Sequence, residues 1–81
     1  MFDVNQFIIM GKYLKIDKSY LYIKVANDQM LKLFITNGLK EKLIEFCSIN
    51  ETIAIKGVIT SNNKYNAILK ATKISFISNK H

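Results

Sequence analysis

Aromatic and lysine side chains alternate with aliphatic ones along Tyr20–Val25 and Leu31–Thr36, a pattern that could stack planar rings and neutralise negative charge. A period of two is typical of a strand with one buried face, so the intervening residues would point outward. The outward residues are Tyr20, Tyr22, Lys24, Lys32, Phe34 and Thr36. Rings beside ammonium groups can stack bases and bind phosphates, which indicates a nucleic-acid surface. Cross-strand packing or a dimer interface would use the same rings.

Two further groups could contribute to such a surface. Asn62, Lys64 and Tyr65 lie in a polar stretch that could fold over a bound strand, although Tyr65 could equally cover one end of the domain. Lys12 and Lys56 each adjoin a glycine, where a ligand can approach the backbone closely. The alternative for both lysines is a solvated side chain beside a bulge glycine.

The basic side chains are 12 lysines without arginine, against 6 acidic residues, for a net charge of +6. This excess favours polyanions, although an AT-rich genome would also enrich lysine. Lysine lacks the bidentate fork that reads guanine, so we expect phosphate binding with little sequence preference. Lys15, Lys70 and Lys73 are interpreted as general basic surface.

Enzymatic, metal and disulfide classes are excluded by composition. The chain has one cysteine, Cys47, and one histidine, His81 at the last position, too few for a zinc site or an internal disulfide. A Ser, His and Asp constellation and a phosphate-binding loop are both missing. We therefore expect no enzyme, no metal and no cofactor, with Cys47 acting as a small buried hydrophobe.

Periodicity predicts five strands and one helix in 81 residues. The expected strands are Val4–Ile16, Tyr20–Val25, Leu31–Thr36, Thr52–Thr60 and Ala67–Ser78. A helix is expected after the third strand, with its apolar residues at Leu39, Leu43, Ile44, Phe46 and Cys47. Gly11 predicts a bend or bulge in the first strand, and Gly57 an interruption of the fourth.

This order is that of the OB-fold, a mainly β, five-stranded Greek-key barrel with a short helix between strands three and four. A chain this short builds one core, so we expect one domain over residues 1–78 and a frayed tail at 79–81. The longest apolar run near the start, Phe7–Met10, is too short for a signal peptide or membrane span, which predicts a cytoplasmic protein without a membrane role.

Three stretches of the chain resemble the core OB domain of the bacterial single-stranded DNA-binding protein family. They are FIIMGKYL at Phe7–Leu14, LFITNGLKEKLIEFCSINETIAIKG at Leu33–Gly57 and ATKISFI at Ala71–Ile77. The resemblance implies binding of single-stranded DNA in replication, recombination or repair, and assembly as a dimer or tetramer.

The sequence departs from that family at its end and at its stacking positions. The family's acidic C-terminal tip, which recruits repair and replication enzymes, has no counterpart at Ser78–His81. The family's base-stacking Trp and Phe positions fall near Met30, Thr36 and the loop around Lys64. The loops between strands two and three and between strands four and five are short. In this respect the chain also resembles primosomal replication protein N.

Three hypotheses about function remain open from the sequence. The first is non-enzymatic binding of single-stranded DNA with little sequence preference. The second is an adaptor that acts through self-association or through replication or primosome proteins. The third is an RNA-binding OB module resembling the small bacterial translation initiation factor.

Overall fold

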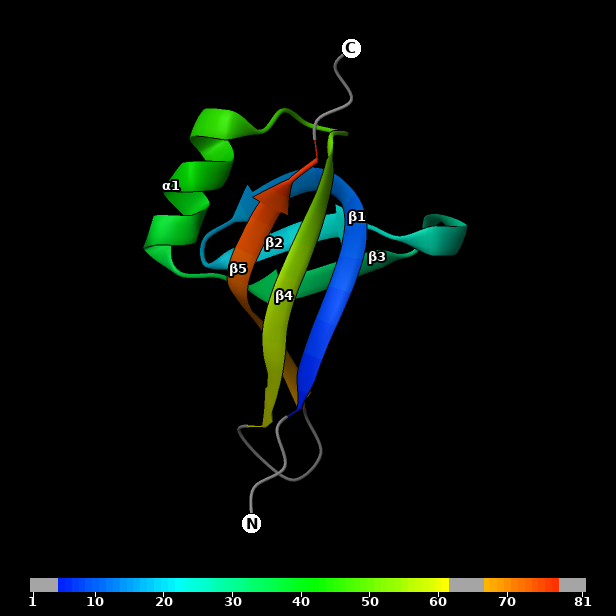
Figure 1. The fold of residues 1–81 in the computed structure, drawn as a ribbon, viewed down its shortest axis with the longest axis vertical. Helices are drawn as coiled ribbons and strands as arrows, with labels where there is room; N and C mark the ends of the chain where they lie inside the picture. Colours follow the sequence, from blue (N-terminus) through cyan, green and yellow to red (C-terminus); the bar gives the residue numbers. More distant parts are fainter. Residues whose placement is uncertain (1–4, 62–66, 78–81) are drawn as a thin grey trace.

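The computed structural model describes residues 5–61 and 67–77, which form five strands, one α-helix and one short 3-10 turn (Figure 1). Their bounds are β1 (Gln6–Asp17), β2 (Tyr20–Lys24), η1 (Ala26–Asp28), β3 (Met30–Phe34), α1 (Asn37–Phe46), β4 (Thr52–Ser61) and β5 (Ala67–Phe76). The predicted order of elements and the OB-fold class are confirmed. The predicted tail at 79–81 lies outside the described residues.

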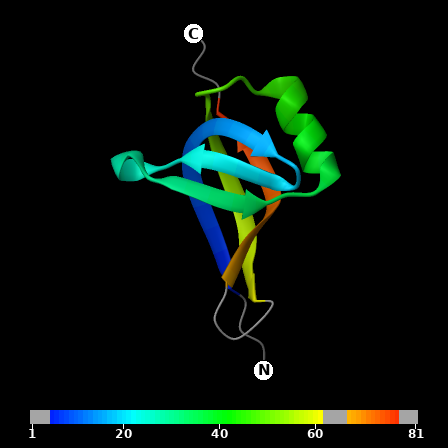
Figure 2. The ribbon, with the colours of Figure 1, turned by 180° about the vertical axis from the view of Figure 1, so that it is seen from behind.

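The strands close into a barrel in the order β1-β2-β3-β5-β4. β1 makes closure possible because Gln6–Lys12 pairs with β4, whereas Lys12–Asp17 pairs with β2. One parallel contact, Phe34 with Lys70, joins β3 to β5. The β2–β3 hairpin therefore crosses the long β1, β4 and β5 strands (Figure 2).

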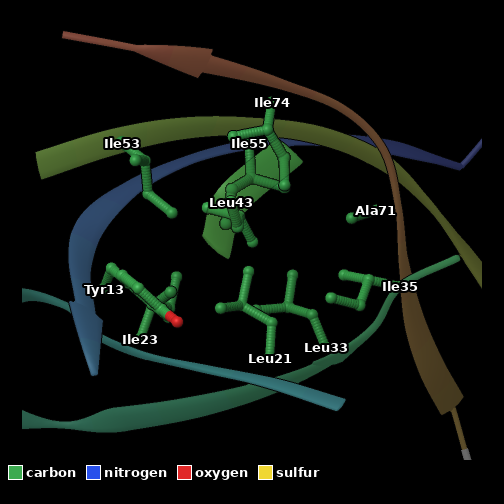
Figure 3. Packing of buried hydrophobic residues seen from close by; sticks show 10 residues of the cluster. All are labelled: Tyr13, Leu21, Ile23, Leu33, Ile35, Leu43, Ile53, Ile55, Ala71 and Ile74. Carbon is green, nitrogen blue, oxygen red and sulfur yellow. The ribbon is translucent and has the colours of Figure 1, made fainter. Parts of the chain in front are cut away.

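The barrel encloses one apolar core to which all five strands, the segment after β3 and the helix contribute (Figure 3). Its members are Tyr13, Leu21, Ile23, Leu33, Ile35, Leu43, Ile53, Ile55, Ala71 and Ile74. The side chains of Leu21, Ile23 and Leu33 are fully buried, which confirms the predicted alternation in β2 and β3. Burial of aliphatic side chains is the main stabilising contribution to a domain of this size.

Helix α1 covers the barrel with a narrower apolar face than predicted. Leu43 is fully buried in the core, and Leu39 and Cys47, four residues to either side, are half-buried against it. Ile44 and Phe46 were expected on the same face, but 61% of each side chain is exposed. The prediction was wrong there because residues spaced by four already cover the contact with the barrel.

One strand irregularity lies away from the glycines, in β1, and the other lies at Gly57, where the sequence predicts one. The β1–β4 ladder runs regularly through Gly11, and the register shift of β1 against β2 lies between Tyr13 and Lys15, so a bulge at Gly11 is wrong. β4 is continuous through Gly57; its ladder with β5 shifts there, and the additional residue is Thr72 on β5. The Thr72 hydroxyl donates a 3.0 Å hydrogen bond to the carbonyl of Lys56.

The turn between β2 and β3 requires left-handed backbone that the sequence can supply. Asn27 and Asp28 have φ of 64° and 57° at the tip of the β2–β3 hairpin, where Asn and Asp tolerate this conformation well.

In the described part of the chain, no helix is long and apolar enough to cross a membrane.

Gly57 should be intolerant of any side chain. A Cβ there would clash with the carbonyl oxygen of Lys70 and lie 2.5 Å from Cζ of Phe7. We expect Gly57→Ala to lower the free energy of unfolding by about 1–3 kcal/mol or more, because a backbone atom cannot move aside. Urea unfolding followed by circular dichroism measures this.

Gly38→Ala is the matched control, because a Cβ at Gly38 would meet no atom within 4 Å. This glycine lies in the first turn of α1, so alanine should stabilise the protein by up to about 1 kcal/mol. Equal effects of the two substitutions would contradict this account of Gly57.

Candidate nucleic-acid interface

The outer faces of β2 and β3 form a continuous surface of rings and lysines. The cross-strand pairs are Tyr20 with Phe34, Tyr22 with Lys32, and Lys24 with Met30. The side chains opposite these, on the inner face, are the buried aliphatic residues of the core. We call the six paired residues the hairpin face. The structure therefore brings together five of the side chains predicted from sequence.

Each ring of the hairpin face contacts an ammonium group. Lys15 Nζ lies 4.9 Å from the centre of the Tyr22 ring, Lys32 Nζ 4.7 Å from that of Tyr20, and Lys70 Nζ 6.0 Å from that of Phe34. Such cation–π contacts contribute about 0.5–1 kcal/mol at exposed sites. The ammonium groups of Lys15, Lys32 and Lys70 therefore lie beside the rings of the hairpin face.

The expected cross-strand packing of rings is also present. Tyr20 and Phe34 meet edge to face, with centroids 6.0 Å apart and planes inclined by 76°. This geometry is favourable for aromatic pairs and leaves part of each ring uncovered. Both rings and Tyr22 are half-buried, so packing on the barrel and access for a ligand coexist.

Lys12 joins the surface beside Lys24, with which it is paired across β1 and β2. Both lysines line a hollow of about 400 Å³ between β1, the start of β4 and the hairpin tip, together with Asp28. Lys24 and Asp28 approach to 3.6 Å in a largely exposed ion pair, which stabilises the fold little. The two cations could therefore attract an anionic group.

The other predicted site residues lie apart from the hairpin face. Thr36 is the N-cap of α1, and its hydroxyl accepts a 3.4 Å hydrogen bond from the Leu39 amide. Lys56 lies on β4, opposite Ile8 of β1 and Lys73 of β5, and β4 has no ladder with β2 or β3. The predicted residues Asn62, Lys64 and Tyr65 lie outside the described residues.

Sequence reasoning missed Lys15 and Lys70 as neighbours of the rings. Lys15 is paired with Tyr22 across the β1–β2 hairpin. Because these strands are adjacent in sequence, their alternation pattern could have indicated this contact. Lys70 reaches Phe34 through the parallel β3–β5 contact, which joins strands distant in sequence. No local pattern predicts that contact.

Catalytic and metal sites find no support in the described part of the chain. Within it, no three His, Cys, Asp or Glu side chains gather in a way that could hold a metal ion. Burial, and secondarily the negative charge of Glu51, raises the pKa of Cys47 to about 11. This thiol is therefore protonated at neutral pH and is a poor nucleophile.

No protein-family model and no curated protein matches the chain. Solved structures do, among them crystal structures of the mitochondrial single-stranded DNA binding protein Rim1 from S. cerevisiae. One aligns with a TM-score of 0.72 at 14% identity over 98% of this chain and 100% of that chain. Another aligns with a TM-score of 0.71 at 13% identity over 98% of this chain and 99% of that one.

The chain has the OB fold. The match to Rim1 spans nearly the full length of both chains, so strand order, helix position and hairpin all correspond. Identity is too low for the comparison to identify shared site residues. The OB fold presents its ligands on the second and third strands, which here carry the hairpin face.

Cys47 offers a test of the packing of α1 on the barrel. Because its pKa is raised to about 11, we expect the thiol to react with a disulfide reagent at pH 8 far more slowly in the folded protein than in denaturant. Absorbance of the released thiolate measures both rates. Equal rates would show that α1 does not cover Cys47.

Proposed function

We propose that this protein binds single-stranded DNA without catalysis and with little sequence preference, in replication, recombination or repair. The observation that carries the proposal is the hairpin face, where three rings and the surrounding lysines share one surface of an OB barrel. Its fold neighbours include single-stranded DNA binding proteins, which supports the same ligand class.

The chemistry of the hairpin face explains why binding would not depend on sequence. Every base has a flat face that can stack on Tyr22 or Phe34, whatever its edge presents. Lysine ammonium groups bind phosphates as point charges and read no base edge. The charged side chains of the face itself, Lys24 and Lys32, are both lysines.

Truncation of the rings should weaken binding. We expect Tyr22→Ala and Phe34→Ala each to lower the affinity for a labelled oligothymidine by about 1–3 kcal/mol, or roughly five- to 150-fold, because each removes one stacking surface. Fluorescence anisotropy measures affinity, and thermal unfolding checks that each variant folds.

Phe46→Ala is the matched control, because this ring is 61% exposed on α1 and away from the hairpin face. It should bind like the original protein. If Tyr22→Ala and Phe34→Ala also bind like the original, the hairpin face is not the binding surface. Competition between DNA and RNA strands of equal length tests the RNA-binding alternative, because only RNA offers the 2′-hydroxyl. Tighter binding of the RNA strand would support that alternative.

We also propose that two copies associate through β1, which is one of the modes of association that the adaptor hypothesis allows. Ile8 and Met10 are 74% and 58% exposed on the outer face of the β1–β4 sheet. Over Gln6–Gly11, β1 has β4 as its ladder partner on one side, and the described strands leave its other edge open. Open edges with exposed apolar side chains favour strand pairing between copies.

Sedimentation velocity tests this association. We expect Ile8→Lys with Met10→Lys to convert a dimer or tetramer into a monomer, because charges cannot be buried in the interface. Ile44→Lys, which changes a 61% exposed isoleucine on α1, should leave the assembly unchanged. A monomeric original protein, or assembly unaffected by the β1 changes, would overturn the proposal.

A further inference from the structure

A hollow of about 270 Å³ opens at the end of the hairpin face, where β2 and β3 meet β4 and β5. Its walls are Tyr20, Phe34, Thr60, Ile68 and Lys70. The sequence pattern does not single out Thr60 and Ile68, and it assigns Lys70 only to the general basic surface. The parallel pairing of Phe34 with Lys70 brings them beside the rings.

The lining of this hollow suits a flat, mostly apolar ring with an anionic substituent. The Tyr20 and Phe34 rings and the Ile68 side chain supply apolar walls, and Lys70 is the charged group. Drug-sized ligands occupy pockets of about 300 Å³ or more, so this hollow has room for one base and little else.

The hydrogen-bonding groups leave the hollow open to any base. The Thr60 hydroxyl donates a 3.4 Å hydrogen bond to the carbonyl of Ile68, so its oxygen keeps a lone pair for an incoming N–H. Lys70 offers donors from its ammonium group, and its reach to the Phe34 ring places that charge beside a base stacked there. The phosphate of the same nucleotide could bind the same ammonium group.

We propose that this hollow receives one unstacked base, with an adjoining phosphate on Lys70, and that it strengthens the selection of single strands over duplex. The inference rests on the proposed function and names a part of the surface that adds to its selectivity. In a duplex each base is paired and stacked, and extruding one costs a few kcal/mol. A single strand supplies an unpaired base without that cost.

The lysines of the surface do not provide this selectivity by themselves. Lys12, Lys24 and Lys32 carry charges that attract the phosphates of single strands and duplexes alike. The hollow differs because its ligand must leave the stack to enter. Filling it should therefore reduce the preference for single strands while preserving attraction to polyanions.

Ile68→Phe fills the hollow without changing the charge, and anisotropy with a labelled oligothymidine and an equal-length duplex measures the effect. We expect single-strand affinity to fall roughly tenfold, the size of one lost base stack, with duplex affinity unchanged. Ile44→Phe, the same substitution at an exposed isoleucine of α1, away from both the hairpin face and β1, should change neither affinity.

Lys70→Met provides a second variant that keeps the length of the side chain and removes its charge. The slope of log affinity against log salt for the single strand should become shallower by about 0.7, the value of one phosphate contact. Thermal unfolding confirms that both variants fold.

The outcomes separate this inference from the proposed function. If the original protein does not prefer single strands, the proposed function fails first. If it prefers them, and Ile68→Phe and Lys70→Met behave like Ile44→Phe, the hollow holds no base and the inference is overturned. A preference reduced in Ile68→Phe alone, with an unchanged slope in Lys70→Met, overturns the phosphate contact of Lys70.

Discussion

The burial of Leu21, Ile23 and Leu33 fixes the register of the β2–β3 hairpin, and the candidate site depends on that register. All three side chains are fully buried, so a slip of one residue would expose them and turn the rings into the core. The energetic cost of losing this core therefore holds Tyr22 and Phe34 on the outer face. Burial of the aliphatic side chains therefore determines which side chains the candidate surface presents.

Closure of the barrel brings side chains of β5 beside the rings of the hairpin face. β1 pairs first with β4 and then with β2, and this change of partner curves the sheet until β3 meets β5. Gly57 permits the close approach of β4 to the Lys70 backbone and the Phe7 ring. The same closure brings Lys70 and Ile68 beside Phe34, so the hollow there is a product of the whole barrel.

Local periodicity predicted the strands, the helix and the outward side chains of the hairpin, because burial imposes a period of two on β2 and β3. It failed where contacts are not local. The exposure of Ile44 and Phe46 depends on how α1 meets the barrel, and the place of Lys70 depends on the β3–β5 contact. Lys56 was grouped with the site for its neighbouring glycine, although β4 carries it to another sheet face.

Chemical-shift mapping by NMR during titration with an oligothymidine would locate the bound strand on the surface of the barrel. We expect the largest shifts in Tyr20, Tyr22, Lys32 and Phe34, with smaller shifts in α1. Shifts concentrated on α1 or around Ile8 and Met10, with the hairpin unchanged, would contradict the claim that the rings and lysines of β2 and β3 hold the strand.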